Sequence, residues 1–471
     1  MMNELLNIKD STIIKLIEYI RDSIKGTLFE GHVYIVGGAV RDWIMGKPCK
    51  DIDIVVDIRD GGIGFANFMA FKNGCLISNK NPVIYPTYGT AKFQLLNNAE
   101  FSDFEIECVQ TRKEQYHKDS RNPSTVFGSI EEDAMRRDLT INALYYNVST
   151  DEVKDYTGRG RYDIAHHIIR TPSNPDIIFN DDPLRILRVI RFATRFGWGI
   201  EKKTWFGMLK NSKRILIVSQ ERITDEINKI LLTDKPSVGI KRMLCCNRLL
   251  EYVLPGVLFQ THVFQNMNPK WSVFEHTMEV LDCIEPKLEY RLAALLHDIG
   301  KLATFNKDFY FHATAGAPLA ETLMKAMKYP NATISNVSMA VALHETLSGY
   351  RDKEMPSKKF LRKFKALTGK NYDLVMSLID ANNKCQYYGK KPNQVTMIRE
   401  KIAQMEAKEH KNLSVVKLPI NGNDIMKNFN VKSGPLIGKL LKVIKEAYFN
   451  NPKITKEECL DLVSDRIKKT M

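Results

Sequence analysis

The spacing of hydrophobic residues changes about a third of the way along the chain. From about residue 33 to residue 160, apolar and polar positions alternate in short runs typical of strands: HVYIVGG, DIDIVVDI, GTAKFQL, FEIECV, TINALYYNV and EVKDYTG. After Asn180 the apolar residues recur at helical spacing, as in DDPLRILRVIRFATRFGW, ERITDEINKILL, FEHTMEVLDCI and RLAALLHDIGKLA. The pattern predicts an α/β head followed by a long all-helical body.

Composition narrows the class of partner and the compartment. The chain has 471 residues and a formal net charge of +14, which favours a polyanion such as nucleic acid, although solubility alone is an alternative. Its eight cysteines form no CxxC motif, which indicates a reducing compartment, and we expect the cytoplasm. The N-terminus is typical of an amphipathic helix and not of a signal peptide, and no apolar run is long enough to predict a membrane span.

Two carboxylates interrupt an otherwise apolar strand pattern in DIDIVV. On a strand, Asp51 and Asp53 point to the same face, about 6.6 Å apart along the chain. Glu105 and Glu107 have the same relationship in the run DFEIECV. Because buried carboxylates without a partner are costly, these residues predict a Mg²⁺ site. An acidic strand that faces water is the alternative.

The glycines before this strand add a second signal. Gly37 and Gly38 end the strand HVYIV, and AVRDWIMG then begins a helix. Backbone without side chains can approach phosphates closely, and a helix N-terminus favours anions. Two glycines, a helix and then two carboxylates on the next strand together indicate a nucleotide site.

At this point the sequence resembles a known family. GGAVRDWIMGKPCKDIDIVV is similar to the signature of nucleotidyltransferases of the DNA polymerase β type, specifically the class II tRNA nucleotidyltransferases, which include CCA-adding enzymes and bacterial poly(A) polymerases. Four further segments resemble family motifs in the family's order: RRDLTINA (136–143), DYTGRGRYDIAHHIIRT (155–171), DDPLRILRVIRFATRFGW (181–198) and ERITDEINKIL (221–231).

The resemblance implies roles for individual residues. Asp51 and Asp53 would bind Mg²⁺ and act in catalysis with a third carboxylate, for which we expect Glu107 and keep Glu105 as the alternative. An RNA 3′-hydroxyl would attack the α-phosphate, and pyrophosphate would leave. The implied nucleotide-binding residues are Gly38, Arg41, Arg137, Asp138, Asn142, Asp182, Arg185, Arg188 and Arg191.

The choice of base can be reasoned from Asp182 and Arg185. We expect them to share one helix face, because they are three residues apart. A carboxylate accepts hydrogen bonds and a guanidinium donates them, which matches the pairing edges of cytosine and adenine and opposes those of guanine and uracil. A plain helix N-cap at Asp182, before Pro183, is the alternative.

The helical body carries a second set of candidate ligands. The pattern of His276, His297, Asp298 and Asp380 resembles the ligand set of HD phosphohydrolases, with His312 and His344 as auxiliary candidates. Imidazole and carboxylate suit Ni²⁺ or Mn²⁺. The resemblance implies hydrolysis of phosphomonoesters or of 2′,3′-cyclic phosphates.

Together these features predict four regions and one main activity. The regions are a nucleotidyltransferase head (1–160), a helical neck that reads the base (161–255), an HD-type domain (256–400) and a helical tail that contacts tRNA (401–471). We expect addition of C, C and A to tRNA from CTP and ATP, since PTYGTAKFQL (86–95) looks like the CCA-adding form. The alternatives are poly(A) synthesis, partial addition, an HD phosphohydrolase with an inactive head, and a structural RNA-binding protein.

Overall fold

The computed structural model describes most of the chain, in two compact units. The described residues are 8, 10–49, 51–72, 82–86, 89–95, 100–101, 104–115, 124–265, 268–304, 311–350, 355–386, 394–415, 418–431, 434–451 and 454–468. One unit comprises residues 1–353 and 365–392, and the other comprises residues 354–364 and 393–471.

The head of the first unit is built on one mixed sheet. Within the described residues it has seven strands in the order β3-β4-β5-β2-β1-β8-β9. β2 and β5 are parallel, and every other neighbouring pair is antiparallel. The strands are β1 (Val33–Val36), β2 (Ile52–Val56), β3 (Val83–Tyr85), β4 (Thr90–Gln94), β5 (Glu105–Gln110), β8 (Leu144–Asn147) and β9 (Val153–Asp155). A separate hairpin pairs β6 (Arg112–Gln115) with β7 (Ser124–Phe127).

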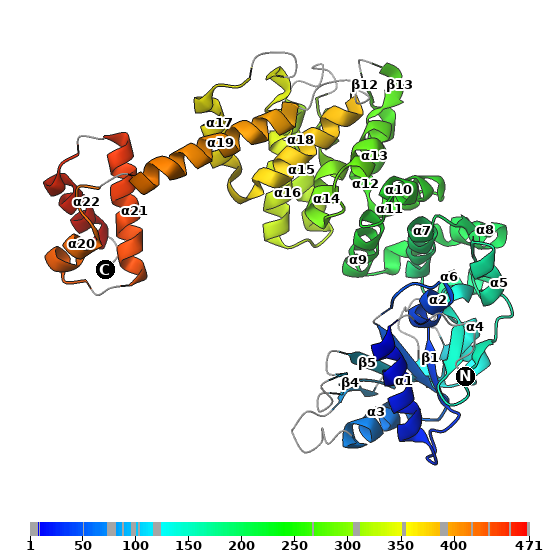
Figure 1. The fold of residues 1–471 in the computed structure, drawn as a ribbon. Helices are drawn as coiled ribbons and strands as arrows, with labels where there is room; N and C mark the ends of the chain where they lie inside the picture. Colours follow the sequence, from blue (N-terminus) through cyan, green and yellow to red (C-terminus); the bar gives the residue numbers. More distant parts are fainter. Residues whose placement is uncertain are drawn as a thin grey trace. The chain divides into compact units, whose positions relative to one another are not determined.

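The strands at the centre of the sheet are apolar because both of their faces are covered. All four residues of β1 are buried, and Tyr34, Val55 and Tyr145 pack in one core cluster with residues of α4 (Ile130–Met135). α3 (Gly61–Lys72) packs against β2, β4 and β5. Figure 1 shows α1 (Ser11–Ile24) and α3 beside these strands. The packing fixes the ends of β1, β2 and β5, where the sequence places its carboxylates and glycines.

The strand pattern of the sequence is confirmed with one local difference. The run TINALYYNV begins with a 3₁₀ turn, η3 (Thr140–Asn142), and only then becomes β8. The N-terminal helix is present as α1, capped by the Asp10 side chain, while residues 1–7 and 9 lie outside the described residues. Residues 87–88 of the stretch PTYGTAKFQL also lie outside them.

Helices follow the head, as their periodicity predicts. α7 (Leu184–Phe196) buries an apolar stripe that includes Ile186, Val189 and Ile190, and it ends at Gly197, whose φ of 70° favours glycine. It packs against α9 and α10. The neighbouring helices are α5 (Gly160–Ala165), α6 (Pro175–Asp181), α8 (Lys202–Asn211), α9 (Gln220–Leu231), α10 (Pro236–Cys245), α11 (Leu249–Val253) and α12 (Pro255–Leu258). The break between α11 and α12 falls in EYVLPGV, where the Pro-Gly pair predicts a joint.

A second helical cluster completes the first unit. α13 packs against α14 and α18, and α16 packs against α14, α15 and α18. The bounds are α13 (Val273–Cys283), α14 (Leu288–Leu296), α15 (His312–Ala326), α16 (Asn331–Leu343) and α18 (Tyr372–Gln386). α17 (Lys358–Thr368) precedes α18 and is divided between the two units.

The second unit has its own small core. Ile420, Ile425, Leu440 and Ile444 are buried together with Cys459 and Val463. These residues come from and around α20 (Gly422–Phe429), α21 (Pro435–Asn450) and α22 (Lys456–Lys468), which follow α19 (Gln394–Val415). The predicted fold class, an α/β head with a mostly helical remainder, is confirmed. The remainder is not all-helical as predicted, because β10 (Ile168–Ile169) pairs with β11 (Gly199–Ile200) and β12 (Phe264–Gln265) pairs with β13 (Asn268–Ser272). Throughout the described residues, every helix is too short or too polar to cross a membrane.

Candidate nucleotidyl-transfer site and a histidine cluster

The turn at Gly37 brings three parts of the head together. Gly37 has a φ of 72°, in the left-handed region that favours glycine, and α2 (Gly38–Ile44) begins directly after it. A Cβ atom on Gly37 would lie 3.7 Å from Oδ2 of Asp53 and 3.7 Å from Nη1 of Arg137. The bare backbone therefore lies within contact distance of a predicted metal ligand and a predicted phosphate-binding cation.

Strand register selects between the two candidate glutamates. β2 and β5 pair so that Asp53 faces Glu107 and Ile52 faces Ile106. Glu105 precedes this paired stretch and accepts a hydrogen bond from Lys92 Nζ at 2.9 Å. The same Nζ lies 3.3 Å from Oε2 of Glu107. Glu107 is thus the strand neighbour of Asp53, and it shares one lysine with Glu105.

The expectation that the strand carboxylates are buried is wrong, since both Asp51 and Asp53 reach solvent. Surrounding protein still removes enough water to raise the pKa of Asp53, and the negative charge of Glu107 raises it further. Among the described residues, three ligand atoms lie within 4.8 Å of one another only in the helical body. The carboxylate oxygens of Asp51, Asp53 and Glu107 in the head are therefore farther apart than this. Their mutual repulsion and their oxygen atoms fit a hard divalent cation such as Mg²⁺.

Asp138 stands at the centre of a polar network behind these carboxylates. Its Oδ1 accepts from Nδ2 of Asn142 at 3.1 Å, and its Oδ2 lies 2.6 Å from Nη2 of Arg188. Nη1 of Arg41 donates to Oδ1 of Asn142 at 2.5 Å. Burial alone would raise the pKa of Asp138, but Arg188 and Asn142 outweigh it and hold that pKa at about 2. The side chain is therefore an ionised hydrogen-bond acceptor.

Arg137 is held by two residues that the sequence did not single out. Its Nε donates to the Tyr145 hydroxyl at 2.9 Å, and its Nη2 donates to Oδ2 of Asp133 at 3.2 Å. Burial would raise the pKa of Asp133, but Arg137 and Arg136 outweigh it and lower that pKa to about 2. The sequence does contain a signal for Asp133. It precedes Arg136 by three residues and Arg137 by four, and residues at these spacings contact each other on a helix.

Asp182 lies just before α7 and not on it. Its extended backbone lets Oδ1 accept from the Leu184 backbone N–H at 3.1 Å. Pro183, and not Asp182, is the N-cap residue of α7, and Asp182 does not share a helix face with Arg185. Oδ2 lies 2.9 Å from Nη2 of Arg222 on α9. Arg185 is buried, and its Nη1 donates to the Ile178 carbonyl at 3.4 Å.

Glu226 on α9 forms ion pairs with two arginines of α7, Arg191 and Arg188. Its Oε2 accepts from Nε of Arg191 at 2.6 Å, and its Oε1 lies 3.7 Å from Nη1 of Arg188. Arg188 in turn reaches Asp138, so α9, α7 and the head are joined by charged side chains. Glu226 lies within the family motif ERITDEINKIL (221–231), but the sequence did not single it out.

The histidines of the helical body converge on one carboxylate. Oδ2 of Asp298 lies 3.2 Å from Nε2 of His297 and 3.7 Å from Nε2 of His276, and its Oδ1 lies 3.2 Å from Nε2 of His312 and 3.7 Å from Nε2 of His344. All but His312 are buried. These residues form two groups of three that share Asp298 and have their ligand atoms within 4.8 Å.

Backbone contacts orient two of these rings. Nδ1 of His297 lies 2.8 Å from the Ala294 carbonyl, and Nδ1 of His344 lies 2.7 Å from the Val341 carbonyl. A donor at Nδ1 leaves Nε2 as the lone-pair nitrogen that faces Asp298. Burial lowers the pKa of His276 to about 3, which keeps that imidazole neutral, as metal ligation requires.

Asp380 does not join this cluster, contrary to the sequence expectation. Its carboxylate pairs with Lys384 at 2.7 Å on the same helix. Two helical positions later, Oδ1 of Asn382 lies 2.9 Å from Nε2 of His276. Because two positions turn the helix by more than half a turn, α18 presents Asn382 inward and Asp380 outward. Lys301 is a further member of the cluster, since its Nζ lies 2.6 Å from Oδ2 of Asp298. It is the lysine of the motif HDIGK, so the sequence contained a signal for it.

Comparison with family models gives three matches along the chain. Residues 33–170 match the poly(A) polymerase head domain. Residues 197–261 match the probable RNA and SrmB-binding site of polymerase A, and residues 310–462 match a putative second domain of tRNA nucleotidyltransferases. The three matches therefore fall in the head, in the helices that come after it, and in the helical residues 310–462.

Curated relatives carry related names. The chain is 39% identical over 229 residues to a mitochondrial CCA tRNA nucleotidyltransferase of Candida glabrata, which is 44% of this chain and 40% of that protein. The Saccharomyces cerevisiae counterpart is 36% identical, over 44% of this chain and 39% of its own length. The matched part thus spans about two fifths of these two relatives. A tRNA nucleotidyltransferase of Schizosaccharomyces pombe is 25% identical over 93% of this chain and 92% of its own.

Solved structures share the fold across nearly the whole chain. The CCA-adding enzyme of Bacillus stearothermophilus in complex with CTP has a TM-score of 0.57 at 18% identity and covers 98% of this chain and 99% of its own. The Thermotoga maritima CCA-adding enzyme complexed with tRNA has a TM-score of 0.56 at 20% identity, covering 97% and 96%. At these identities the likeness concerns the fold.

Proposed function

Because this chain belongs to the family of nucleotidyltransferases with a poly(A) polymerase head domain, which includes CCA tRNA nucleotidyltransferases, we propose that it adds C, C and A to the 3′ end of tRNA. CTP and ATP would be the substrates, and pyrophosphate the second product. The observation that carries the proposal is the ion pair of Arg188 with Asp138, at 2.6 Å. It joins the helix that follows Asp182 to the head, which also carries the carboxylates, so a base, a ribose and a triphosphate can be held at once.

Each group of residues would meet a different part of the nucleotide. Asp138 and Asn142 are hydrogen-bonding partners for the ribose, whose 2′-hydroxyl both donates and accepts. Arg137, beside Gly37, is a cation for the phosphates. Asp182 accepts from an exocyclic amino group and Arg185 donates to a ring nitrogen, which suits C and A.

Asp51, Asp53 and Glu107 would hold the divalent ion, which we propose to be Mg²⁺. When bound, such an ion supplies an activated hydroxyl nucleophile and stabilises the charge on the leaving pyrophosphate. The role of the sheet is to keep Asp53 and Glu107 side by side through their strand register.

Primer extension tests this proposal directly. A tRNA that lacks its last three nucleotides should gain two residues with CTP, none with ATP alone, and three with both. Asp53→Ala should abolish extension while the circular dichroism spectrum stays that of the wild type. Long A tails with ATP alone would replace the proposal with poly(A) synthesis, and a stop after two nucleotides in both NTPs would replace it with partial addition.

A second function is favoured by the five-residue cluster around Asp298. We propose that His276, His297, His312, His344 and Asp298 hold Ni²⁺ or Mn²⁺ for hydrolysis of phosphomonoesters or 2′,3′-cyclic phosphates at RNA ends. The bound metal would supply a water nucleophile at neutral pH. Lys301, beside Asp298, adds a cation for the substrate phosphate.

The hydrolase proposal has a matched pair of variants. With 2′,3′-cyclic AMP and Ni²⁺ or Mn²⁺, Asp298→Asn should lose turnover, whereas Asp380→Asn should keep it, because Asp380 pairs with Lys384 and lies outside the histidine cluster. Asp53→Ala should also keep it. Absence of metal-dependent turnover in the wild-type chain, or equal loss in both aspartate variants, would contradict the assignment.

The cytoplasm is the compartment we propose, on the basis of the unpaired cysteine pattern. The mitochondrial relatives make mitochondria the alternative. Fractionation of cells that express the tagged chain decides between them.

A further inference from the structure

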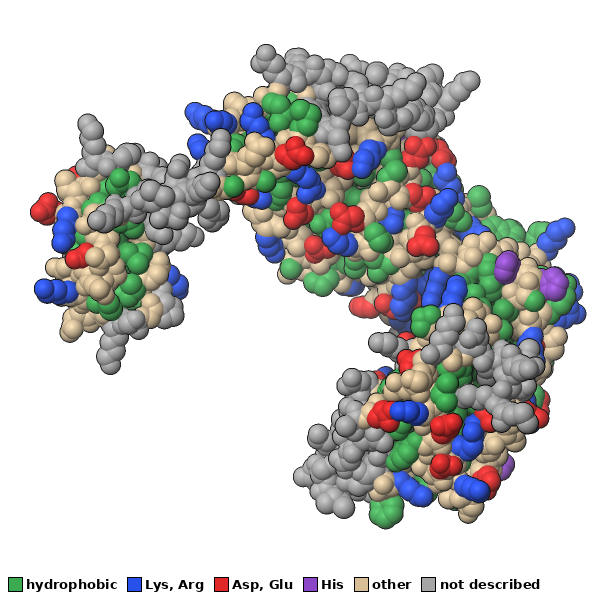
Figure 2. Space-filling model, viewed as in Figure 1, with side chains coloured by type: hydrophobic (Ala, Val, Ile, Leu, Met, Phe, Trp, Pro, Cys, Tyr) green, Lys and Arg blue, Asp and Glu red, His purple; other side chains and the backbone are tan. Residues whose placement is uncertain are grey.

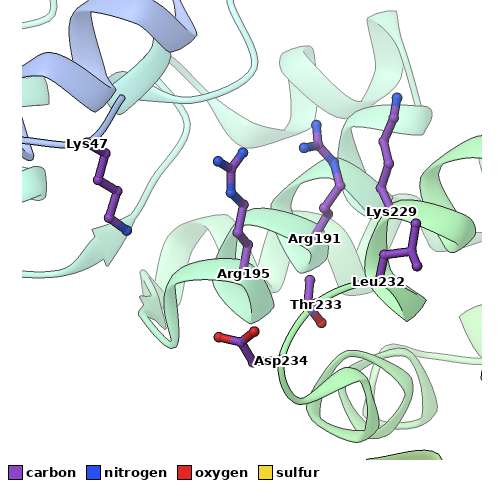
Figure 3. Close-up of a pocket in the computed structure, with 7 residues that line it drawn as sticks. All are labelled: Lys47, Arg191, Arg195, Lys229, Leu232, Thr233 and Asp234. Atoms are coloured by element: carbon purple, nitrogen blue, oxygen red, sulfur yellow. The ribbon is translucent and has the colours of Figure 1, made fainter. Parts of the chain in front are cut away.

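A basic cavity lies at the junction of the head with the helices that follow it. Its volume is about 550 Å³, and Lys47, Arg191, Arg195 and Lys229 line it together with Asp234. Figure 3 shows Lys47, from the loop after α2, across from the side chains of Arg195 and Arg191 on α7 and Lys229 on α9. Four cations thus meet one carboxylate.

Two of the four cations are already compensated by neighbours. Nε of Arg191 bonds Oε2 of Glu226 at 2.6 Å, and Nζ of Lys229 bonds Oδ2 of Asp225 at 2.6 Å. Figure 2 shows blue side chains, those of Lys and Arg, gathered where α7 and α9 meet the head.

The other two cations, Lys47 and Arg195, lack a close acidic partner. Nη2 of Arg195 is 4.0 Å from Oδ2 of Asp42, whose carboxylate already bonds Arg41 at 2.8 Å. In the described part of the chain, Lys47 has no ion pair at all. The cavity therefore presents an excess of positive charge from a head loop and from the last turn of α7.

Aromatic rings hold these two cations in place. The rings of Phe192 and Phe196 stack with centroids 5.9 Å apart. Lys47 Nζ lies 5.1 Å from the Phe196 centroid, and the Arg195 guanidinium lies 5.3 Å from it. Because a ring face attracts a cation, both charged groups are held near the Phe196 ring and do not extend freely into solvent.

The cavity lies toward the end of α7 that is remote from the proposed base-reading residues, although Arg191, one of the residues implied to bind the nucleotide, also lines it. Arg185 is in the first turn of α7 and Arg195 in the last, which separates them by about 15 Å along the helix axis at roughly 1.5 Å per residue. The ribose partner Asp138 contacts α7 between them, at Arg188. Arg195 thus lies about two helical turns beyond the ribose contact, toward the end of α7.

We propose that this cavity binds backbone phosphates of the RNA strand just upstream of the reacting 3′ end, with Lys47 and Arg195 as the contacting residues. The inference rests on the proposed nucleotidyl transfer. Ammonium and guanidinium groups bind phosphate oxygens without reading sequence, so contacts of this kind suit an enzyme that must accept many different tRNAs.

The test separates RNA binding from nucleotide binding. Lys47→Gln/Arg195→Gln should weaken binding of tRNA lacking its last three nucleotides by about tenfold or more in a filter assay without NTP, and the slope of log K against log salt should become about 1.5 less negative, at about 0.7 to 0.9 per phosphate contact. The KM values for CTP and ATP should stay within about twofold of wild type. Lys72→Gln is the matched control, since Lys72 also lies over a phenylalanine ring, Phe68, but on α3.

Each other result overturns the assignment in its own way. Raised KM values for CTP and ATP with unchanged RNA affinity would make the cavity a triphosphate site. Unchanged values for both, in a chain whose wild type extends tRNA, would show that the cavity binds neither. A wild-type chain that binds tRNA but never extends it would instead contradict the proposed function and leave the binding comparison intact.

Discussion

Arg222 on α9 and Asp182 before α7 form an ion pair, with Nη2 of Arg222 2.9 Å from Oδ2 of Asp182. The other carboxylate oxygen caps the Leu184 backbone N–H at 3.1 Å. Both oxygens of the proposed base-reading aspartate are therefore fixed before any nucleotide arrives. A fixed, ionised acceptor is what selection of an exocyclic amino group requires.

Removing this restraint should reduce base selectivity. Arg222→Gln is expected to lower the preference for CTP and ATP over GTP and UTP by about tenfold, because Asp182 can then turn away from the base. Arg222→Lys should recover part of the preference, since a lysine keeps the charge but not the planar guanidinium. Competition assays with mixed nucleotides measure the ratio, and an unchanged ratio in Arg222→Gln would show that the pair is only structural.

The two glutamates of β5 should behave differently. Glu107→Gln is expected to lower kcat by about 10² or more, because Glu107 is the strand neighbour of Asp53 and contributes charge at the metal site. Glu105→Gln, which removes only a surface contact with Lys92, should stay within about threefold of wild type. Single-turnover extension with saturating Mg²⁺ compares them, and equal losses would refute the strand-register argument.

Breaking the link between Arg188 and Asp138 should affect both nucleotides equally. Arg188→Gln is expected to lower kcat/KM for CTP and for ATP by about 10², since it loosens the ribose partner and not the base reader. The pKa of Asp138 should rise toward its ordinary range when its main cation is removed. A selective loss for one base would place Arg188 on the base instead.

Acid should weaken the support of Arg137. The pKa of Asp133 is lowered to about 2 in the folded chain from its ordinary value of 3.8, so its ionised form contributes to stability above about pH 4, and this contribution is lost as pH falls toward 2. Asp133→Asn should destabilise the head by about 2 kcal/mol at pH 7. Melting curves of both full chains from pH 7 to pH 2.5 should converge, and a gap that widens in acid would contradict this sign.

Nickel or manganese should stabilise the helical body through the cluster. A ligand that binds only the folded state raises its melting temperature. The transition should rise by several degrees with either metal in the wild-type chain and not in Asp298→Asn. Asp380→Asn should respond as the wild type does, and a response that survives in Asp298→Asn would place the metal elsewhere.

Local spacing explains what could be predicted about the fold and the site. The alternation in DIDIVV and the helical recurrence after Asn180 depend only on neighbouring residues, and the strands and helices they predict are present. The turn beside Asp53 could also be predicted from Gly37 and Gly38, because the backbone freedom of glycine is a property of the residue itself.

Tertiary packing decided the rest, because it concerns residues far apart in the chain. The amino-acid sequence by itself determined an α/β head, a helical remainder and the residue types of two candidate sites, one of carboxylates and one mainly of histidines. Only the pairing of β2 with β5 placed Glu107, and not Glu105, next to Asp53. Only the rotation of α18 turned Asn382 toward His276 and Asp380 away from it. Only the packing of α9 on α7 placed Arg222 next to Asp182. Register, rotation and helix contact depend on the burial of many side chains at once, which no short motif contains.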